Sequence, residues 1–215
     1  MKSLVIFDLD GTLVDTINDL ANACNHALEQ EGFPTHHLST YQFYVGNGVT
    51  KLIERALPSD AVTPETINRV RTRFMEYYDV HNVDASQPYY GISELVKQLV
   101  ANGVKLAVAS NKYQSAVEYI CTTLFPDVPW VALEGQKPNV NVKPDPSIVF
   151  EILSKCPTPK QEVIMVGDSA VDIETARRAC IESVGVTWGF RPESELVGAR
   201  ADHIIDRPME LLKYL

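Results

Sequence analysis

The sequence predicts an α/β fold: a doubly wound, Rossmann-like parallel sheet that carries an inserted α-helical cap. Short and largely apolar runs recur along the chain, at residues 4–7, 104–109, 163–166 and 184–186. Such runs are typical of parallel strands that are buried on both faces. Amphipathic helical patterns lie between the later runs, and this alternation of strand and helix indicates a doubly wound sheet.

The core elements follow one another in a simple order from residue 92 onward. Apolar residues at helical spacing predict helices over residues 92–100 and 116–124, and a weaker apolar run over residues 128–133 indicates a further strand. A third helix is expected after Asp145 and Pro146, with the aspartate as N-cap and the proline in the first helical position.

Residues 13–82 break this alternation. Three helical patterns occur there in succession, around residues 17–28, 49–57 and 64–78, with no apolar strand between them. The economical interpretation is a helical lobe inserted after the first strand. The predicted domains are a catalytic core of residues 1–12 and 83–215 and a cap of residues 13–82.

Composition narrows the classes of function. The chain has 215 residues, 19 basic against 28 acidic side chains and a formal net charge of −9. An acidic protein of this kind argues against a nucleic-acid or membrane-surface binder, which would normally be basic. No 18-residue apolar run occurs. The apolar start is shorter than a secretory signal needs, so we expect it to form a strand. We therefore expect a cytoplasmic protein, a monomer or homodimer, without a nucleic-acid or membrane partner.

Polar side chains follow three of the predicted strands. Asp8 and Asp10 come directly after the first strand, residues 110–112 (Ser-Asn-Lys) follow the run that ends at residue 109, and Asp168 follows the run that ends at residue 166. Ligands of open parallel sheets bind beyond the carboxyl ends of the strands. These side chains are therefore expected to converge on one site, although they lie far apart in the sequence.

The residue types of this site suit phosphoryl transfer. Asp8, Asp10 and Asp168 are hard oxygen ligands without a neighbouring His or Cys, which favours Mg²⁺ over zinc. A carboxylate can attack phosphorus, and a second carboxylate two residues on can protonate the leaving oxygen and then activate water. Lys143 could neutralise the anionic pocket, and Ser110 could hold a phosphate oxygen.

At this point the chain resembles the haloacid dehalogenase-like phosphatases. All four motifs of that family occur in order, and the resemblance covers essentially the whole chain, including a helical cap after the first motif. The motifs are the run Asp8-Leu-Asp10-Gly-Thr12, Ser110 after an apolar strand, Lys143 before a proline, and Gly167-Asp168-Ser-Ala-Val-Asp172.

The resemblance implies a role for each matching residue. Asp8 would be the nucleophile and Asp10 the general acid and base, while Ser110 and Lys143 would bind the transferring phosphoryl group. The implied Mg²⁺ ligands are the carboxylates of Asp8 and Asp168 and the backbone carbonyl of Asp10, with Asp172 supporting the water shell of the metal. These four carboxylates and Lys143 carry a formal charge of −3, which one Mg²⁺ would reduce to −1.

A finer similarity is to the phosphoglycolate phosphatases. It rests on residues 10–16, 45–49, 110–112 and 185–189, and it implies a small phosphorylated metabolite as substrate. The relatives that isomerise sugar phosphates usually carry a His shortly after the first motif, and this chain has none there. The residues expected to contact the substrate are Thr12, Gly46, Asn47, Gly48 and Asn111.

Several alternatives stay open from the sequence. Lys137 also precedes a proline and competes with Lys143, Ser110 could merely cap a helix, and Gly46 and Gly48 could be plain turn glycines. The same site could serve a pyrophosphatase, a sugar-phosphate phosphatase or a mutase. A different class is a non-catalytic regulatory domain that is phosphorylated on Asp8.

Overall fold

In the computed structural model, which describes residues 2–215, the chain divides into two units. One unit comprises the chain up to Asp15 and from Pro88 onward, and the other comprises Thr16–Gln87. The boundaries predicted from the sequence lie after residues 12 and 82, slightly earlier in both cases. The short strands β2 (Val14–Asp15) and β3 (Gln87–Pro88), which were not predicted, pair with each other close to these boundaries.

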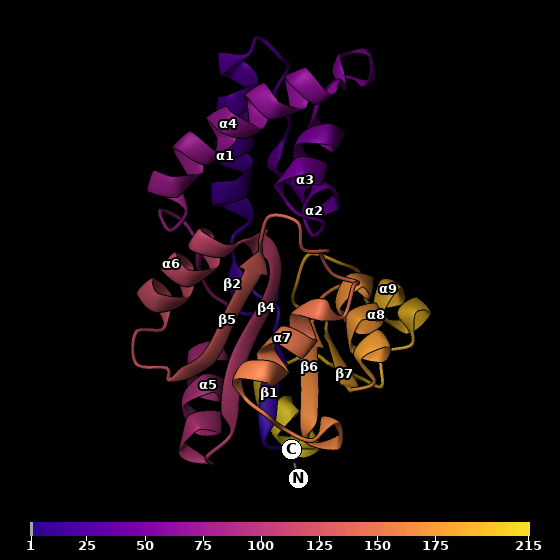
Figure 1. The fold of residues 1–215 in the computed structure, drawn as a ribbon. Coiled ribbons are helices and arrows are strands. Elements are labelled where there is room, and N and C mark those ends of the chain that lie inside the picture. The colour runs from indigo at the N-terminus through magenta and orange to yellow at the C-terminus, as the bar shows by residue number, and fades with distance from the viewer. Residues whose placement is uncertain (1) are drawn as a thin grey trace. The chain divides into compact units, whose positions relative to one another are not determined.

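The first unit is built on a six-stranded sheet in the order β5-β4-β1-β6-β7-β8 (Figure 1). Every described strand pair in it is parallel, and β1 lies in the centre, with Leu4 in register with Lys105 of β4 and Val163 of β6. The predicted fold class is confirmed. The strands are β1 (Leu4–Phe7), β4 (Lys105–Tyr113), β5 (Trp130–Gln136), β6 (Val163–Gly167), β7 (Glu182–Val186) and β8 (His203–Ile205).

Helices cover the sheet because β1 is apolar on both faces. Its four residues are fully buried, and successive side chains point to opposite faces. Leu4 and Ile6 pack in one apolar cluster with Ile152 and Ala176, which come from two helices that Figure 1 labels α7 and α8. The helices of this unit are α5 (Ile92–Ala101), α6 (Gln114–Leu124), α7 (Ser147–Lys155), α8 (Ala170–Ala179) and α9 (Glu193–Ala199).

Three local details differ from the sequence prediction. Strand β4 continues to Tyr113, so residues 110–112 lie within the strand and not after it. Pro146 is the N-cap of α7, one position later than predicted, because the Asp145 carboxylate accepts the Ser147 N–H at 2.9 Å from just outside the helix. Strand β8 was not predicted, since its three residues are too few to form a distinct apolar run.

The second unit is helical, as the sequence predicts for this region. It contains α1 (Ile17–Gln30), α2 (Leu38–Tyr44), α3 (Val49–Ala56) and α4 (Pro64–His81). Helix α4 begins as a capped helix should, because Thr63 Oγ1 accepts the Thr66 N–H at 3.2 Å and Pro64 occupies the first turn. Helix α2 was not predicted. Among the described residues, no helix has both the length and the apolar character needed to cross a membrane.

A buried carboxylate ties the two ends of the helical unit together. Asp19, in the first turn of α1, is 2% exposed and accepts hydrogen bonds from the N–H groups of Ala85 and Ser86 at 2.8–3.1 Å. The Ser86 hydroxyl donates to the same carboxylate at 2.6 Å. The segment that leaves the helical unit is therefore fixed beside the segment that enters it.

Replacing this carboxylate should destabilise the helical unit. In Asp19→Ala, the buried N–H groups of Ala85 and Ser86 lose their acceptor, which should lower the free energy of unfolding by roughly 2–4 kcal/mol. Urea denaturation measures the change, and the exposed Asp60→Ala serves as a matched control that should stay within about 0.5 kcal/mol of the parent protein. Equal stability of the two variants would show that Asp19 does not hold these segments.

Candidate active site

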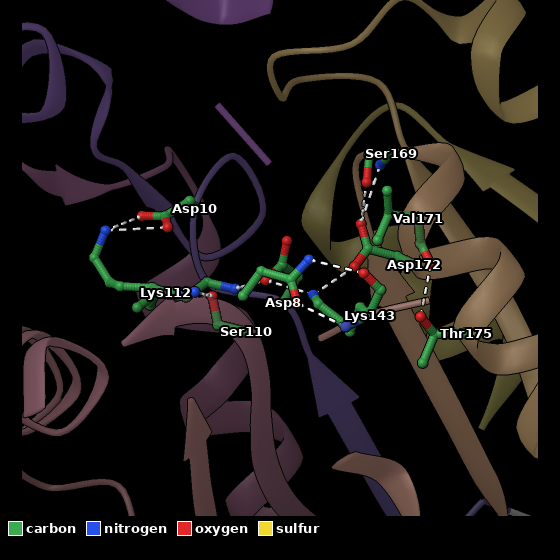
Figure 2. Close-up of polar contacts among 11 residues, drawn as sticks. Asp8, Asp10, Ser110, Lys112, Lys143, Ser169, Val171, Asp172 and Thr175 are labelled. Atoms are coloured by element: carbon green, nitrogen blue, oxygen red, sulfur yellow. Dashed lines mark hydrogen bonds and ion pairs between the residues drawn. The ribbon is translucent and has the colours of Figure 1, made fainter. Parts of the chain in front are cut away.

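The candidate site forms where the central strands β1 and β6 end, beside the last part of strand β4. Asp8 continues the line of β1, and its N–H donates to Val166 O of β6 at 2.9 Å. Ser110 lies on the neighbouring strand β4, and Asp168 follows β6 directly. All three side chains are buried. Asp8 and Ser110 lie close together at this edge of the sheet (Figure 2), and carboxylate oxygens of Asp168 and Asp8 lie within 4.8 Å of each other.

Lys143 is the positive centre of this cluster. Its Nζ lies 2.9 Å from Asp8 Oδ1 and 2.6 Å from Asp172 Oδ1, and the residue is only 2% exposed (Figure 2). The competing Lys137 binds Glu134 and Glu151 instead. Of the two lysines that precede a proline, the structure therefore places Lys143 beside the candidate nucleophile.

Asn111 holds the backbone of Lys143 in place. Its Nδ2 donates to Lys143 O at 3.1 Å, and its Oδ1 accepts the Lys143 N–H at 2.8 Å. The loop that carries the lysine is thereby fastened to strand β4 through both atoms of one amide. The geometry supports a positioning role for Asn111, and the substrate contact expected from the sequence stays a prediction.

Burial shapes the ionisation of the cluster. It raises the pKa of Asp8 to about 7, although the neighbouring Lys143 ammonium opposes this effect. Burial also raises the pKa of Asp168 well above its usual range, with a further contribution from the negative charges of Asp172 and Asp8. For Lys143, burial lowers the pKa, but the ion pairs with Asp172 and Asp8 outweigh it and hold the pKa above its usual range. The cluster therefore favours a further cation.

The donor set fits a magnesium ion. Carboxylate oxygens of Asp8, Asp168 and Asp172 lie within 4.8 Å of one another, and hard oxygen donors of this kind suit Mg²⁺. Asp172 is also engaged elsewhere, because its Oδ1 binds Lys143 and its Oδ2 accepts the N–H and hydroxyl of Ser169 at 3.2 and 2.7 Å. These contacts suit the supporting role predicted for Asp172 behind the ligands Asp8 and Asp168.

Lys112 lies at the site, as expected for residues 110–112, but the sequence predicted no role for it. Its Nζ lies 2.9 and 3.1 Å from the two carboxylate oxygens of Asp10 (Figure 2). Asp10 is thereby neutralised separately from the cluster around Lys143. The formal charge of Asp8, Asp168, Asp172 and Lys143, all ionised, is −2 and not the −3 expected from the sequence. One divalent cation would neutralise this remainder.

The loop after β7 fixes Asp168. The Phe190 N–H donates to Asp168 Oδ2 at 2.7 Å, and Trp188 Nε1 donates to Thr12 O at 3.0 Å. Gly189 lies between these two contacts. A Cβ atom at position 189 would come within 2.3 Å of Asp168 Cβ and 2.4 Å of Gly11 O, so the close approach of the two loops requires glycine there.

The other predicted substrate contacts fall in two places. Thr12 is fully buried in the sheet unit, and its Oγ1 has no hydrogen-bond partner among the residues that the structure describes. Gly46, Asn47 and Gly48 belong to the helical unit, where both glycines have a positive φ and Asn47 Oδ1 accepts from Arg55 Nη2 at 2.7 Å. Contact of these four residues with a substrate stays a prediction.

Comparison with known proteins settles the family. A family model described as haloacid dehalogenase-like hydrolase matches residues 5–186, which is most of the chain. The chain belongs to the haloacid dehalogenase-like hydrolases. The family named from the motifs is thereby confirmed, and with it the conclusion that the chain is a hydrolase.

Individual relatives are similar over nearly the whole length. The phosphoglycolate phosphatase of Colwellia psychrerythraea is 34% identical over 88% of this chain and 86% of its own. That of Vibrio cholerae is 33% identical over 96% and 94%. Among solved structures, a Lactobacillus delbrueckii protein is 34% identical and superimposes with a TM-score of 0.91, covering 100% of this chain and 98% of its own.

A methyl group at position 189 should disturb the contact between the two loops. Because the nearest neighbours of that methyl are Asp168 Cβ and a backbone oxygen, Gly189→Ala should lower the free energy of unfolding by about 1–3 kcal/mol in urea denaturation. The control is Gly198→Ala in α9, where nothing lies within 4 Å and alanine should stabilise the helix by about 0.5–1 kcal/mol. Equal effects of the two substitutions would contradict the close approach.

Proposed function

We propose that this hydrolase is a Mg²⁺-dependent phosphatase of small phosphorylated metabolites that works through an aspartyl phosphate on Asp8, with 2-phosphoglycolate as its substrate. The observation that carries the proposal is the environment of Asp8. This carboxylate lies at the end of the central strand, 2.9 Å from a buried ammonium group and next to two further carboxylates. An ammonium group and a metal site beside a nucleophile are what attack on a phosphate dianion requires.

In the first half of the reaction, an Asp8 oxygen forms a bond to phosphorus and the bond from phosphorus to the ester oxygen breaks. Asp10 donates a proton to the departing alkoxide, which leaves as the alcohol. The ammonium of Lys143 and the hydroxyl of Ser110 bind the oxygens of the transferring phosphoryl group and stabilise its charge.

In the second half, Asp10 accepts a proton from water, and the water oxygen attacks the phosphorus of the aspartyl phosphate. The bond from phosphorus to Asp8 breaks, so inorganic phosphate is released and the Asp8 carboxylate is regenerated. One carboxylate thus serves as acid and then as base, and it ends the cycle in the protonation state in which it began.

Asp8 and Asp168 are the side chains that would hold Mg²⁺, with Asp172 orienting its water ligands. When bound, the ion lowers the repulsion between the carboxylate and the phosphate and stabilises the charge of the transition state. Asn111 and the loop around Gly189 contribute by position only, since they hold Lys143 and Asp168 in place.

Two lines of support bear on the substrate. Relatives that cover most of this chain at 33–34% identity are named phosphoglycolate phosphatase. The chain also lacks, shortly after the first motif, the His that relatives which isomerise sugar phosphates usually carry. Pyrophosphate, sugar phosphates and a purely regulatory phosphorylation of Asp8 are the alternatives that a substrate panel separates.

The panel compares 2-phosphoglycolate, pyrophosphate and a hexose phosphate, each with Mg²⁺ and with a chelator, by release of inorganic phosphate. We expect multiple turnover with Mg²⁺, loss of turnover with chelator and the highest kcat/KM for 2-phosphoglycolate. Asp8→Asn should lose more than about 1,000-fold in kcat, because the nucleophile is gone. The exposed Asp127→Asn should retain the parent rate.

Three outcomes would contradict the proposal in different ways. Near-parental rates in Asp8→Asn would exclude Asp8 as the nucleophile. Equal kcat/KM values for all three phosphates would remove the assignment to 2-phosphoglycolate. A stable aspartyl phosphate without turnover would favour the regulatory alternative.

A further inference from the structure

Lys112 forms an ion pair with Asp10, the residue that must donate a proton to the leaving oxygen. The carboxylate is therefore engaged before a substrate binds. Lys112 Nζ lies within 3.1 Å of both Asp10 carboxylate oxygens, and the two side chains are only 3% and 12% exposed. The lysine is held on β4, where its N–H donates to Ser110 Oγ at 3.3 Å. Lys112 is thus a buried cation at the edge of the reacting centre.

This arrangement sets a requirement for the substrate. In the proposed function, Asp10 must lie about 2.6–3.2 Å from the ester oxygen to transfer a proton. An Asp10 carboxylate that turns toward the ester oxygen gives up at least one of its contacts with Lys112. Withdrawing an anion from a buried ammonium group costs free energy unless another anion takes its place. A substrate that brings its own second anion removes this cost.

We propose that Lys112 determines specificity by binding a second anionic group of the substrate, a carboxylate one carbon removed from the ester oxygen, in exchange for Asp10. The inference rests on the proposed function and names the chemical class that fits it: the phosphate ester of a 2-hydroxy carboxylic acid. Binding of the carboxylate to Lys112 releases Asp10 from the ion pair. Asp10 then takes up a proton from solvent water and donates it to the departing ester oxygen, so recognition and proton transfer depend on the same lysine.

The distances suit a two-carbon acid. Lys112 Nζ lies at hydrogen-bond distance, 2.9 Å, from Asp10 Oδ1. During proton transfer, the Asp10 carboxyl group would lie at hydrogen-bond distance from the ester oxygen. A substrate carboxylate that is joined to this ester oxygen through a single carbon is therefore close enough to bind Lys112 Nζ. An ester with a neutral group at that position leaves the ammonium to Asp10 and should react slowly, although its phosphoryl group meets the same Asp8, Ser110 and Lys143.

The test compares 2-phosphoglycolate with 2-hydroxyethyl phosphate, in which a neutral alcohol replaces the carboxylate. The parent protein should prefer the carboxylate by at least about 10-fold in kcat/KM, since a charge-assisted hydrogen bond contributes roughly 1.5–3 kcal/mol. In Lys112→Met this preference should fall about 10- to 100-fold, mainly through a higher KM for 2-phosphoglycolate. Lys112→Arg should retain it, and so should the exposed control Lys97→Met.

Several results would overturn the inference. A parent protein that hydrolyses both esters equally well would refute it without any variant and leave the phosphatase function standing. The same holds if Lys112→Met lowers kcat/KM equally for both esters, because Lys112 would then only position Asp10. If the parent protein hydrolyses neither ester nor any other phosphate, the proposed function itself fails. Loss of folding in Lys112→Met, seen by circular dichroism, leaves the parent and Lys112→Arg comparisons to decide.

Discussion

The buried ion pairs of Lys143 are the interaction on which the site depends. The ammonium lies between Asp8 at the end of β1 and Asp172 in the first turn of α8, 2.9 and 2.6 Å away. A buried charge without a partner costs several kcal/mol, so neither carboxylate could stay there ionised alone. The Asn111 amide accepts a hydrogen bond from the backbone N–H of Lys143. The Ser169 hydroxyl donates to the other oxygen of the Asp172 carboxylate that Lys143 binds. Central strand, neighbouring strand and helix terminus are thereby fixed around one positive charge.

The site divides its charges between two lysines, and this division explains how an acidic protein can handle an anion. Lys112 pairs with Asp10, while Lys143 pairs with Asp8 and Asp172. The carboxylates that remain in excess gather where a divalent cation fits. The net charge of −9 is a sum over the whole chain and says little about this local field.

The parts of the site that depend only on the order of the strands could be predicted from the sequence. Asp8 and Asp168 come directly after apolar runs, and parallel neighbouring strands end at one edge, so their convergence could be predicted. The convergence of residues 110–112 could be predicted in the same way, but the contact between Lys112 and Asp10 could not. Strand β4 continues to Tyr113 with a shift of register after Ala109, and the direction of side chains there depends on this irregularity. The contact of Asn111 with the backbone of Lys143 could not be predicted either, because Lys143 lies in a loop that is distant in sequence.

The central claim is that this environment makes Asp8 the nucleophile. Acid quenching during turnover of 2-phosphoglycolate, followed by borohydride reduction and peptide mass spectrometry, tests it directly, because borohydride converts an aspartyl phosphate to homoserine. The account predicts homoserine at position 8 alone. Homoserine at Asp10 or Asp168 instead, or its absence at position 8 under conditions in which phosphate is released and a synthetic acyl phosphate is trapped, would contradict the account.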